Sequence, residues 1–131
     1  MVLSFTVSPD RYAICKLPAT SPVPTGFLHK PFFAVTRTSD ELSIVLSEKA
    51  VSPEWESEMG WRMLKVNGPL DFNIVGVVAS ISAPLAEAGI PIFVISTFDT
   101  DYLLVKDENL EKSVRLLEEK GHNVERTEKR T

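Results

Sequence analysis

Gly68-Pro69-Leu70-Asp71-Phe72-Asn73 begins the stretch that decides the fold of this chain. It follows an apolar run at Trp61–Val66, which predicts a strand, and leads into apolar residues spaced to share one helical face. These are Val77, Ile81, Leu85 and Ala88. Asp71 or Asn73 is expected to cap this helix, and Gly89 to end it. Pro84 conflicts with a helix, because an internal proline costs about 3 kcal/mol.

The residues that follow continue the pattern. Ile90–Ile95 is an apolar run typical of a central strand, and Asp99-Thr100-Asp101 predicts a turn into a strand at Tyr102–Val105. A second helix is predicted from Leu110, Val114 and Leu117, capped by Asp107 or Asn109 and stopped by Gly121, with an edge strand at Asn123–Thr127. The order β-α-β-β-α-β predicts a four-stranded antiparallel sheet with two helices on one face.

The first sixty residues are richer in strand signals. Strands are predicted at Leu3–Val7, Tyr12–Leu17, Phe32–Arg37 and Leu42–Leu46, the last two as a hairpin, with a short helical turn capped by Ser52. We therefore predict an α+β fold of two ferredoxin-like units packed together, residues 1–60 and 61–131. The first unit is expected to be a degraded, strand-rich copy of the second.

Bulk properties exclude several classes of protein. The net charge of −4 argues against a nucleic-acid partner, which would require a basic face. The single cysteine excludes an internal disulfide and favours a reducing compartment. The N-terminus predicts no signal peptide, and no apolar run approaches the roughly 18 residues of a membrane span. We therefore expect a cytoplasmic protein that does not contact a membrane.

Three segments together resemble the ACT domain, a βαββαβ amino-acid-binding regulatory module. They are Gly68–Phe72, Ala83–Ile90 and Ile95–Val105. Within that family, the chain is similar to the Castor-type cytosolic arginine sensors and to the regulatory ACT units of aspartate kinase. The resemblance covers about half of the chain and is weaker in the first half. The alanine-proline-leucine-alanine-glutamate segment around Pro84 recurs in that family, so the resemblance implies that the proline belongs to the fold.

The resemblance implies a ligand-binding site but no catalytic residues, metal or cofactor, and so no enzyme. The implied ligand contacts come from the loop after the first strand and from both ends of the second strand. They are Asp71, Phe72, Asn73, Gly89, Ile90, Ser96, Thr97, Phe98, Thr100 and Asp101. The implied partners are an amino acid or similar small effector, a second copy of the chain as a homodimer, and a protein that reads the bound state.

The residues themselves leave two interpretations open for the acidic positions. Backbone N–H groups at a helix N-terminus attract a carboxylate, and Asp71 beside them could accept an ammonium group, or Asp71 could be only a helix cap. Asp99 and Asp101 could bind a cationic ligand end, or could be ordinary turn residues.

Other reactive side chains are predicted to be structural. His29 and His122 do not have metal-ligand spacing, and an imidazolium at His122 would suit a helix C-terminus. Cys15 is expected to be a small buried hydrophobe, and Trp55 and Trp61 to pack at the junction of the two halves.

Two functions therefore remain open. The first is a non-catalytic regulatory protein that binds an amino acid and signals through an ACT–ACT interface. The alternative is a structural ACT scaffold that mediates oligomerisation or partner binding without a small ligand. An enzyme is not expected, because no nucleophile–base pair or metal signal is present.

Overall fold

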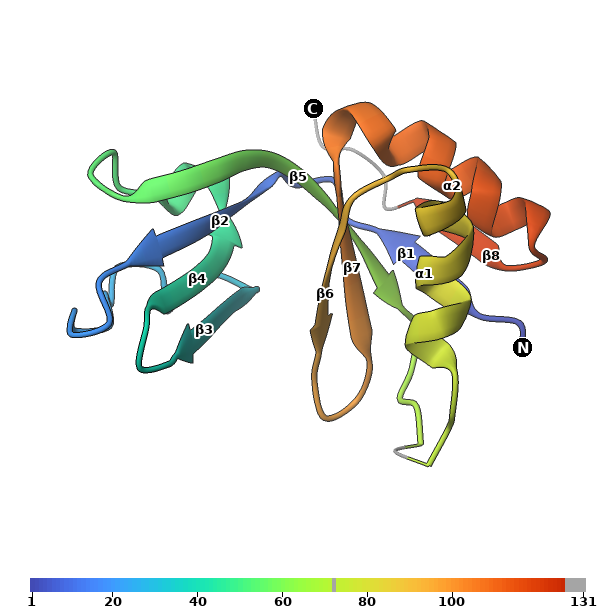
Figure 1. The fold of residues 1–131 in the computed structure, drawn as a ribbon, viewed down its shortest axis with the longest axis horizontal. Helices are drawn as coiled ribbons and strands as arrows, with labels where there is room; N and C mark the ends of the chain where they lie inside the picture. Colours follow the sequence, from blue (N-terminus) through green and yellow to red (C-terminus); the bar gives the residue numbers. More distant parts are fainter. Residues whose placement is uncertain (72, 127–131) are drawn as a thin grey trace. The chain divides into compact units, whose positions relative to one another are not determined.

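The computed structural model describes residues 1–71 and 73–126, and the chain divides into two compact units (Figure 1). Met1–Pro9 and the described residues from Arg62 onward form one, which we call the helical unit. Asp10–Trp61 form the other, the strand unit. The predicted division at residue 60 differs from this one, because the first nine residues belong with the C-terminal part of the chain.

The helical unit contains five strands in the order β6-β7-β5-β1-β8. Their bounds are β1 Ser4–Val7, β5 Glu56–Val66, β6 Ile92–Ser96, β7 Asp101–Lys106 and β8 Asn123–Arg126. Only the C-terminal part of β5 belongs to this unit. Residues 61–126 show the predicted β-α-β-β-α-β order.

The predicted four-stranded antiparallel sheet was incomplete, because β1 enters it from the N-terminus. Phe5 lies antiparallel to Val66 of β5 and parallel to Val124 of β8. Phe5 and Val7 are both buried, so the alternating side chains of β1 contribute directly to this core. A pairing across more than a hundred residues leaves no local pattern in the sequence, which explains why it was missed.

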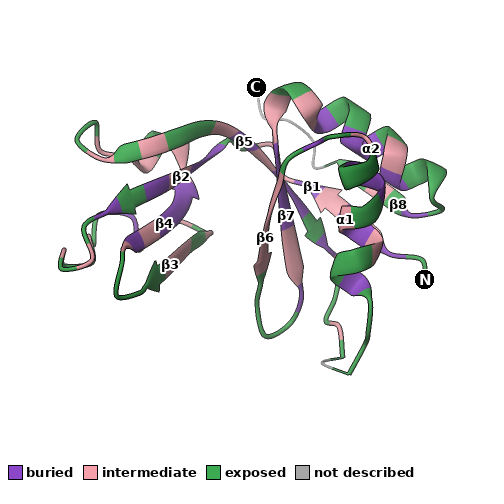
Figure 2. Ribbon diagram, viewed as in Figure 1, coloured by how far each residue is buried: buried purple, intermediate pink, exposed green. Residues whose placement is uncertain are grey.

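Two helices, α1 (Val77–Glu87) and α2 (Leu110–Glu119), lie along the strands of the helical unit (Figure 1). The predicted apolar stripes are confirmed. Val77, Ile81 and Leu85 of α1 are buried in one core with Leu110, Val114 and Leu117 of α2 and side chains of β1, β5 and β7 (Figure 2). The helix continues through Pro84, which is itself buried.

Both helices end as predicted, at glycines with positive φ. Gly89 (φ 74°) follows α1, where the Gly89 N–H donates to the Ala86 carbonyl and the Ile90 N–H to the Leu85 carbonyl. Gly121 (φ 93°) ends α2 with the same pair of bonds. These are Schellman caps. They require one residue in the left-handed conformation, which glycine adopts without steric cost.

The predicted start of the first helix was wrong, whereas the second helix has its N-cap at Asn109, one of the two residues predicted for it. The first helix begins at Val77, and its N-cap is Gly76 in the left-handed region (φ 87°), not Asp71 or Asn73. The Asp71 carboxylate instead accepts the Asn73 N–H at 2.9 Å, which is a local turn. The second helix is preceded by a 3-10 turn, η2 (Asp107–Asn109), and its start has no side-chain cap. Asp107 pairs with Arg62 at 3.0 Å.

The strand unit contains a sheet in the order β3-β4-β2-β5, to which β5 contributes its N-terminal part. The other elements are β2 Tyr12–Leu17, β3 Phe33–Arg37, β4 Leu42–Ser47 and a 3-10 helix, η1, at Glu48–Ala50. The predicted hairpin is confirmed, with Val35 opposite Ile44. Its core is formed by Phe27 and buried residues of β2 and β4. The predicted helical turn at Ser52 is only a turn, and the short helix lies earlier, at η1.

Candidate functional site

A hollow of about 470 Å³ lies in the helical unit between the start of α1 and the turn that joins β6 to β7. We call it the acidic hollow. Its lining comes from three segments: Leu70, Asp71, Ile74 and Gly76 of the loop, Val77, Val78 and Ala79 of α1, and Ser96, Thr97, Phe98, Asp99, Thr100 and Asp101 of the turn. The volume falls within the range of small-molecule pockets.

Hydrogen bonds hold the loop and the turn together behind this hollow. The Leu70 N–H donates to the Asp99 carbonyl at 2.7 Å, and the Thr100 hydroxyl donates to the Val66 carbonyl at the end of β5 at 2.6 Å. Thr100 is only 5% exposed. A Cβ added at Gly68 would lie 3.0 Å from the Leu70 nitrogen and 3.2 Å from the Asp99 oxygen, so the close approach of the two segments requires glycine.

The turn has its own internal hydrogen bonds. The Thr97 N–H and hydroxyl both donate to the Thr100 carbonyl, at 2.8 and 2.9 Å. The Ser96 hydroxyl donates to the Asp101 carboxylate at 2.5 Å, across the last registered pair of β6 and β7. Phe98 at the tip is 78% exposed. The backbone of the turn is therefore fixed, and Phe98 extends its apolar surface toward solvent.

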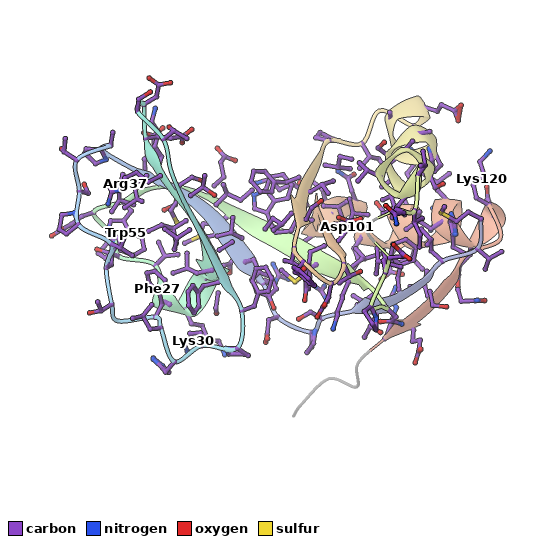
Figure 3. The ribbon with its side chains drawn as sticks, turned by 90° about the horizontal axis from the view of Figure 1, so that it is seen from below. Phe27, Lys30, Arg37, Trp55, Asp101 and Lys120 are labelled. Atoms are coloured by element: carbon purple, nitrogen blue, oxygen red, sulfur yellow. The ribbon has the colours of Figure 1, made fainter. Side chains whose placement is uncertain are left out.

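The electrostatics of the hollow combine two opposite features. The N-terminus of α1 has no side-chain cap and no acidic residue in its first turn, so its N–H groups and helix dipole favour an anion. Asp71, Asp99 and Asp101 line the same hollow, and their negative charges favour a cation. Asp101 is labelled in Figure 3. A zwitterion, with one group of each sign, matches both features.

Among the residues that the structure describes, no three of His, Cys, Asp and Glu converge closely enough to hold a metal ion. Ion pairing and hydrogen bonding are the interactions that the carboxylates of the acidic hollow can offer a ligand.

Six of the predicted contact residues line the acidic hollow: Asp71, Ser96, Thr97, Phe98, Thr100 and Asp101. Asn73 is exposed and does not line it. Gly89 and Ile90 lie at the opposite end of α1, where they form the helix cap, and Ile90 is buried in the core. The predicted contact at Phe72 lies outside the described residues.

Sequence reasoning missed the contribution of residues 76–79, because it placed the helix start several residues too early. Gly76 was the available signal, since glycine is an accepted N-cap residue and readily adopts the left-handed conformation.

His122 differs from the prediction of a charged residue at a helix C-terminus. It is buried, and its Nδ1 accepts the Leu3 N–H at 3.0 Å, which requires a neutral ring with its proton on Nε2. Burial lowers the pKa of His122, and the positive N-terminus lowers the pKa further. His122 therefore joins the residue before β1 to the segment that follows α2, as a neutral residue.

Cys15 is buried in β2, as predicted. Its sulfur lies 3.3 Å from the Ser57 hydroxyl, and burial raises the pKa of the thiol, an effect that the Ser57 hydrogen bond partly offsets. A thiol of this kind is a poor nucleophile at neutral pH.

In the described part of the chain, no helix is both long and apolar enough to span a bilayer.

Comparison with known proteins identifies the family. A model described as ACT domain matches residues 56–119, and a second model, described as an N-terminal domain, matches residues 10–54. This chain belongs to the ACT-domain family. The predicted resemblance and the α+β fold class are thereby confirmed.

Relatives of this ACT-domain protein include the cytosolic arginine sensor for mTORC1 subunit 1 of Bos taurus. The two are 31% identical over 126 residues, which is 89% of this chain and 36% of the relative. The chain thus spans about a third of the length of that sensor.

Solved structures extend the comparison. A protein of Agrobacterium tumefaciens is 35% identical and has a TM-score of 0.94, with 100% of this chain and 98% of that chain covered. The regulatory subunit of aspartate kinase from Thermus thermophilus shares the fold at 13% identity, with a TM-score of 0.58 and coverage of 88% and 95%.

Proposed function

We propose that this ACT-domain protein is a non-catalytic regulatory protein that binds an amino acid in the acidic hollow. One observation carries the proposal: the uncapped N-terminus of α1 and three acidic residues line the same hollow of about 470 Å³. The α-carboxylate of the ligand would accept hydrogen bonds from the N–H groups of residues 77–79. Its α-ammonium, and a cationic side chain where one is present, would be held by Asp71, Asp99 and Asp101.

The excess of negative charge gives the proposed site a preference. The lining contains three acidic side chains and no Lys or Arg. An amino acid with a cationic side chain would therefore gain an additional ion pair, whereas an acidic amino acid would face repulsion. The Bos taurus relative is named an arginine sensor, which supports a preference for a cationic amino acid.

The rim of the acidic hollow supports a further part of the proposal, a homodimer through an ACT–ACT interface. Three exposed apolar side chains line the hollow, Ile74 (42%), Val78 (42%) and Phe98 (78%), and Val75 (86%) is next to Ile74 in the chain. Apolar surface gathered around a binding site is typical of an interface. A second copy would cover this rim and enclose the ligand, and ligand binding would then shift the population of dimers. We also propose that this regulatory protein is cytoplasmic.

A thermal-shift series with the twenty amino acids tests the ligand. Ligand at about 100 times its dissociation constant stabilises by roughly 2.7 kcal/mol, which raises Tm by several degrees in a domain of this size. We expect arginine or lysine to give the largest shift and glutamate none. Asp101→Asn and Asp71→Ala should reduce the shift, whereas Asp40→Asn, on an exposed turn of the strand unit, should preserve it.

The structural scaffold remains the second candidate, and the exposed rim favours it equally. Light scattering with and without ligand separates the two. A dimer that forms regardless of ligand, combined with no thermal shift at millimolar amino acid, would establish the scaffold. A monomer under every condition would rule out the interface in both versions.

A further inference from the structure

The strand unit contains a second hollow, of about 360 Å³, formed entirely within residues 24–55. We call it the basic hollow. Its lining comes from the loop before β3 and from the segment around η1: Pro24, Gly26, Phe27, His29, Lys30, Lys49, Ala50 and Trp55. Figure 3 labels Phe27, Lys30 and Trp55, which come from these two segments.

The titratable side chains that line the basic hollow are all basic. Lys30, Lys49 and His29 line it, and no carboxylate does. Neither lysine forms an ion pair with a residue that the structure describes. The adjacent Glu48 is directed elsewhere, because its carboxylate accepts the Gly60 N–H at 2.6 Å. Two ammonium groups around one hollow repel each other, so an anion between them would be stabilised.

The floor of the basic hollow is apolar and well supported. Phe27 is 1% exposed and contacts Phe33 edge to face, with ring centroids 5.2 Å apart. Trp55 is half-buried and packs against the core cluster of the strand unit. The accessible part of the Trp55 ring can therefore pack against a flat or apolar ligand group, with Phe27 supporting the hollow from below.

Hydrogen-bonded turns fix the backbone on both sides. The Lys30 N–H donates to the Phe27 carbonyl at 2.9 Å, and the Lys49 N–H donates to the Ser47 hydroxyl at 3.3 Å. The two lysines therefore extend from positions that are already ordered, which reduces the entropy cost of binding.

We propose that the basic hollow is a binding site for a small organic anion, a phosphate or carboxylate joined to a flat apolar group. Lys30 and Lys49 hold the anionic group, and Trp55 packs against the apolar group. The net charge of −4 disfavours a nucleic acid, which would need a basic face much larger than one hollow. This site is independent of the amino-acid site proposed above, which has the opposite charge.

The test is a titration of the full chain followed by ¹H–¹⁵N NMR, with phenyl phosphate, inorganic phosphate and benzylamine as probes. We expect phenyl phosphate to produce saturable shifts at the amides of Gly26, Lys30, Lys49 and Ala50 and at the Trp55 indole. Inorganic phosphate should bind several-fold more weakly and leave the indole unmoved. Benzylamine, a flat cation, should produce no shift at these positions.

Lysine variants provide the decisive comparison. The double substitution Lys30→Gln with Lys49→Gln should weaken the binding of phenyl phosphate about tenfold. Lys16→Gln, at an exposed position on β2, should leave that affinity unchanged. The spectrum of each variant reports directly whether it is folded, and added NaCl at about 0.5 M should weaken binding to the unsubstituted chain. Shifts that survive the double substitution, or equal shifts with benzylamine, would overturn the site. Equal affinity for phosphate and phenyl phosphate would overturn the role of Trp55.

Discussion

In the helical unit, a helix N-terminus faces a β-turn across the acidic hollow, whereas in the strand unit a loop and a 3-10 helix surround the basic hollow. Asp10–Trp61, all described, contain no α-helix. The helical unit can therefore offer a ligand backbone N–H groups and a dipole, but the strand unit must rely on side-chain charge and an aromatic surface. The two units thus present opposite charges by different means, which predicts different ligands.

Matched core substitutions should have the largest effect and test whether the two units are packed equally well. Leu85 and Leu46 are both fully buried, one in each unit. We expect Leu85→Ala and Leu46→Ala each to lower the free energy of unfolding by about 2–5 kcal/mol, measured by urea denaturation. Val75→Ala, at an 86% exposed position, should change it by less than about 0.5 kcal/mol. A cost below about 1 kcal/mol at Leu46 alone would mean that the strand unit is loosely packed.

Thr100→Val should be the next most damaging change, because it removes the hydroxyl that donates to the buried Val66 carbonyl. An unsatisfied buried acceptor costs about 1–3 kcal/mol. Thr36→Val on the exposed part of β3 is the matched change in the strand unit and should be nearly neutral. Equal stability of the two variants in urea would show that this hydrogen bond does not hold the turn to β5.

Neutralising the acidic hollow sharpens the comparison of charge. Asp99→Asn with Asp101→Asn should weaken binding of a cationic amino acid about tenfold, or roughly 1.4 kcal/mol, as measured by calorimetry. Phenyl phosphate binding to the strand unit should not change. If both ligands weaken together, the two sites are not independent.

The pH dependence of stability should report on the buried histidine of the helical unit. Burial lowers the pKa of His122, so the unfolded chain takes up a proton before the folded chain does. Its contribution to stability is therefore fully present above the unfolded value of about 6.5 and declines as the pH falls below it. Urea midpoints from pH 7.5 to 5 should fall more steeply for the unsubstituted chain than for His122→Asn, which retains an acceptor for Leu3.

Thr36→Val, on the exposed part of β3, serves again as the control, because it leaves every titratable group in place. It should keep the steep decline of the unsubstituted chain. Identical curves for the unsubstituted chain and His122→Asn would show that His122 does not titrate differently on folding.

Local patterns predicted much of the helical unit. The stripes at Ile81 and Leu117 and the glycines at 89 and 121 act over a few residues, through side-chain periodicity and backbone conformation. Six of the contact residues implied by the resemblance to ACT domains line the acidic hollow. The prediction for the start of α1 failed because Asp71 and Asn73 are good cap residues that form a turn of their own.

The amino-acid sequence by itself determined the order of helices and strands, the ends of both helices and the resemblance to ACT domains. Tertiary structure alone decided that β1 lies between β5 and β8, that His122 accepts the Leu3 N–H, and that Lys30 and Lys49 share one hollow with Trp55. Each of these joins segments far apart in the chain. Local conformational preferences do not encode such contacts, which form only when the apolar side chains are buried together.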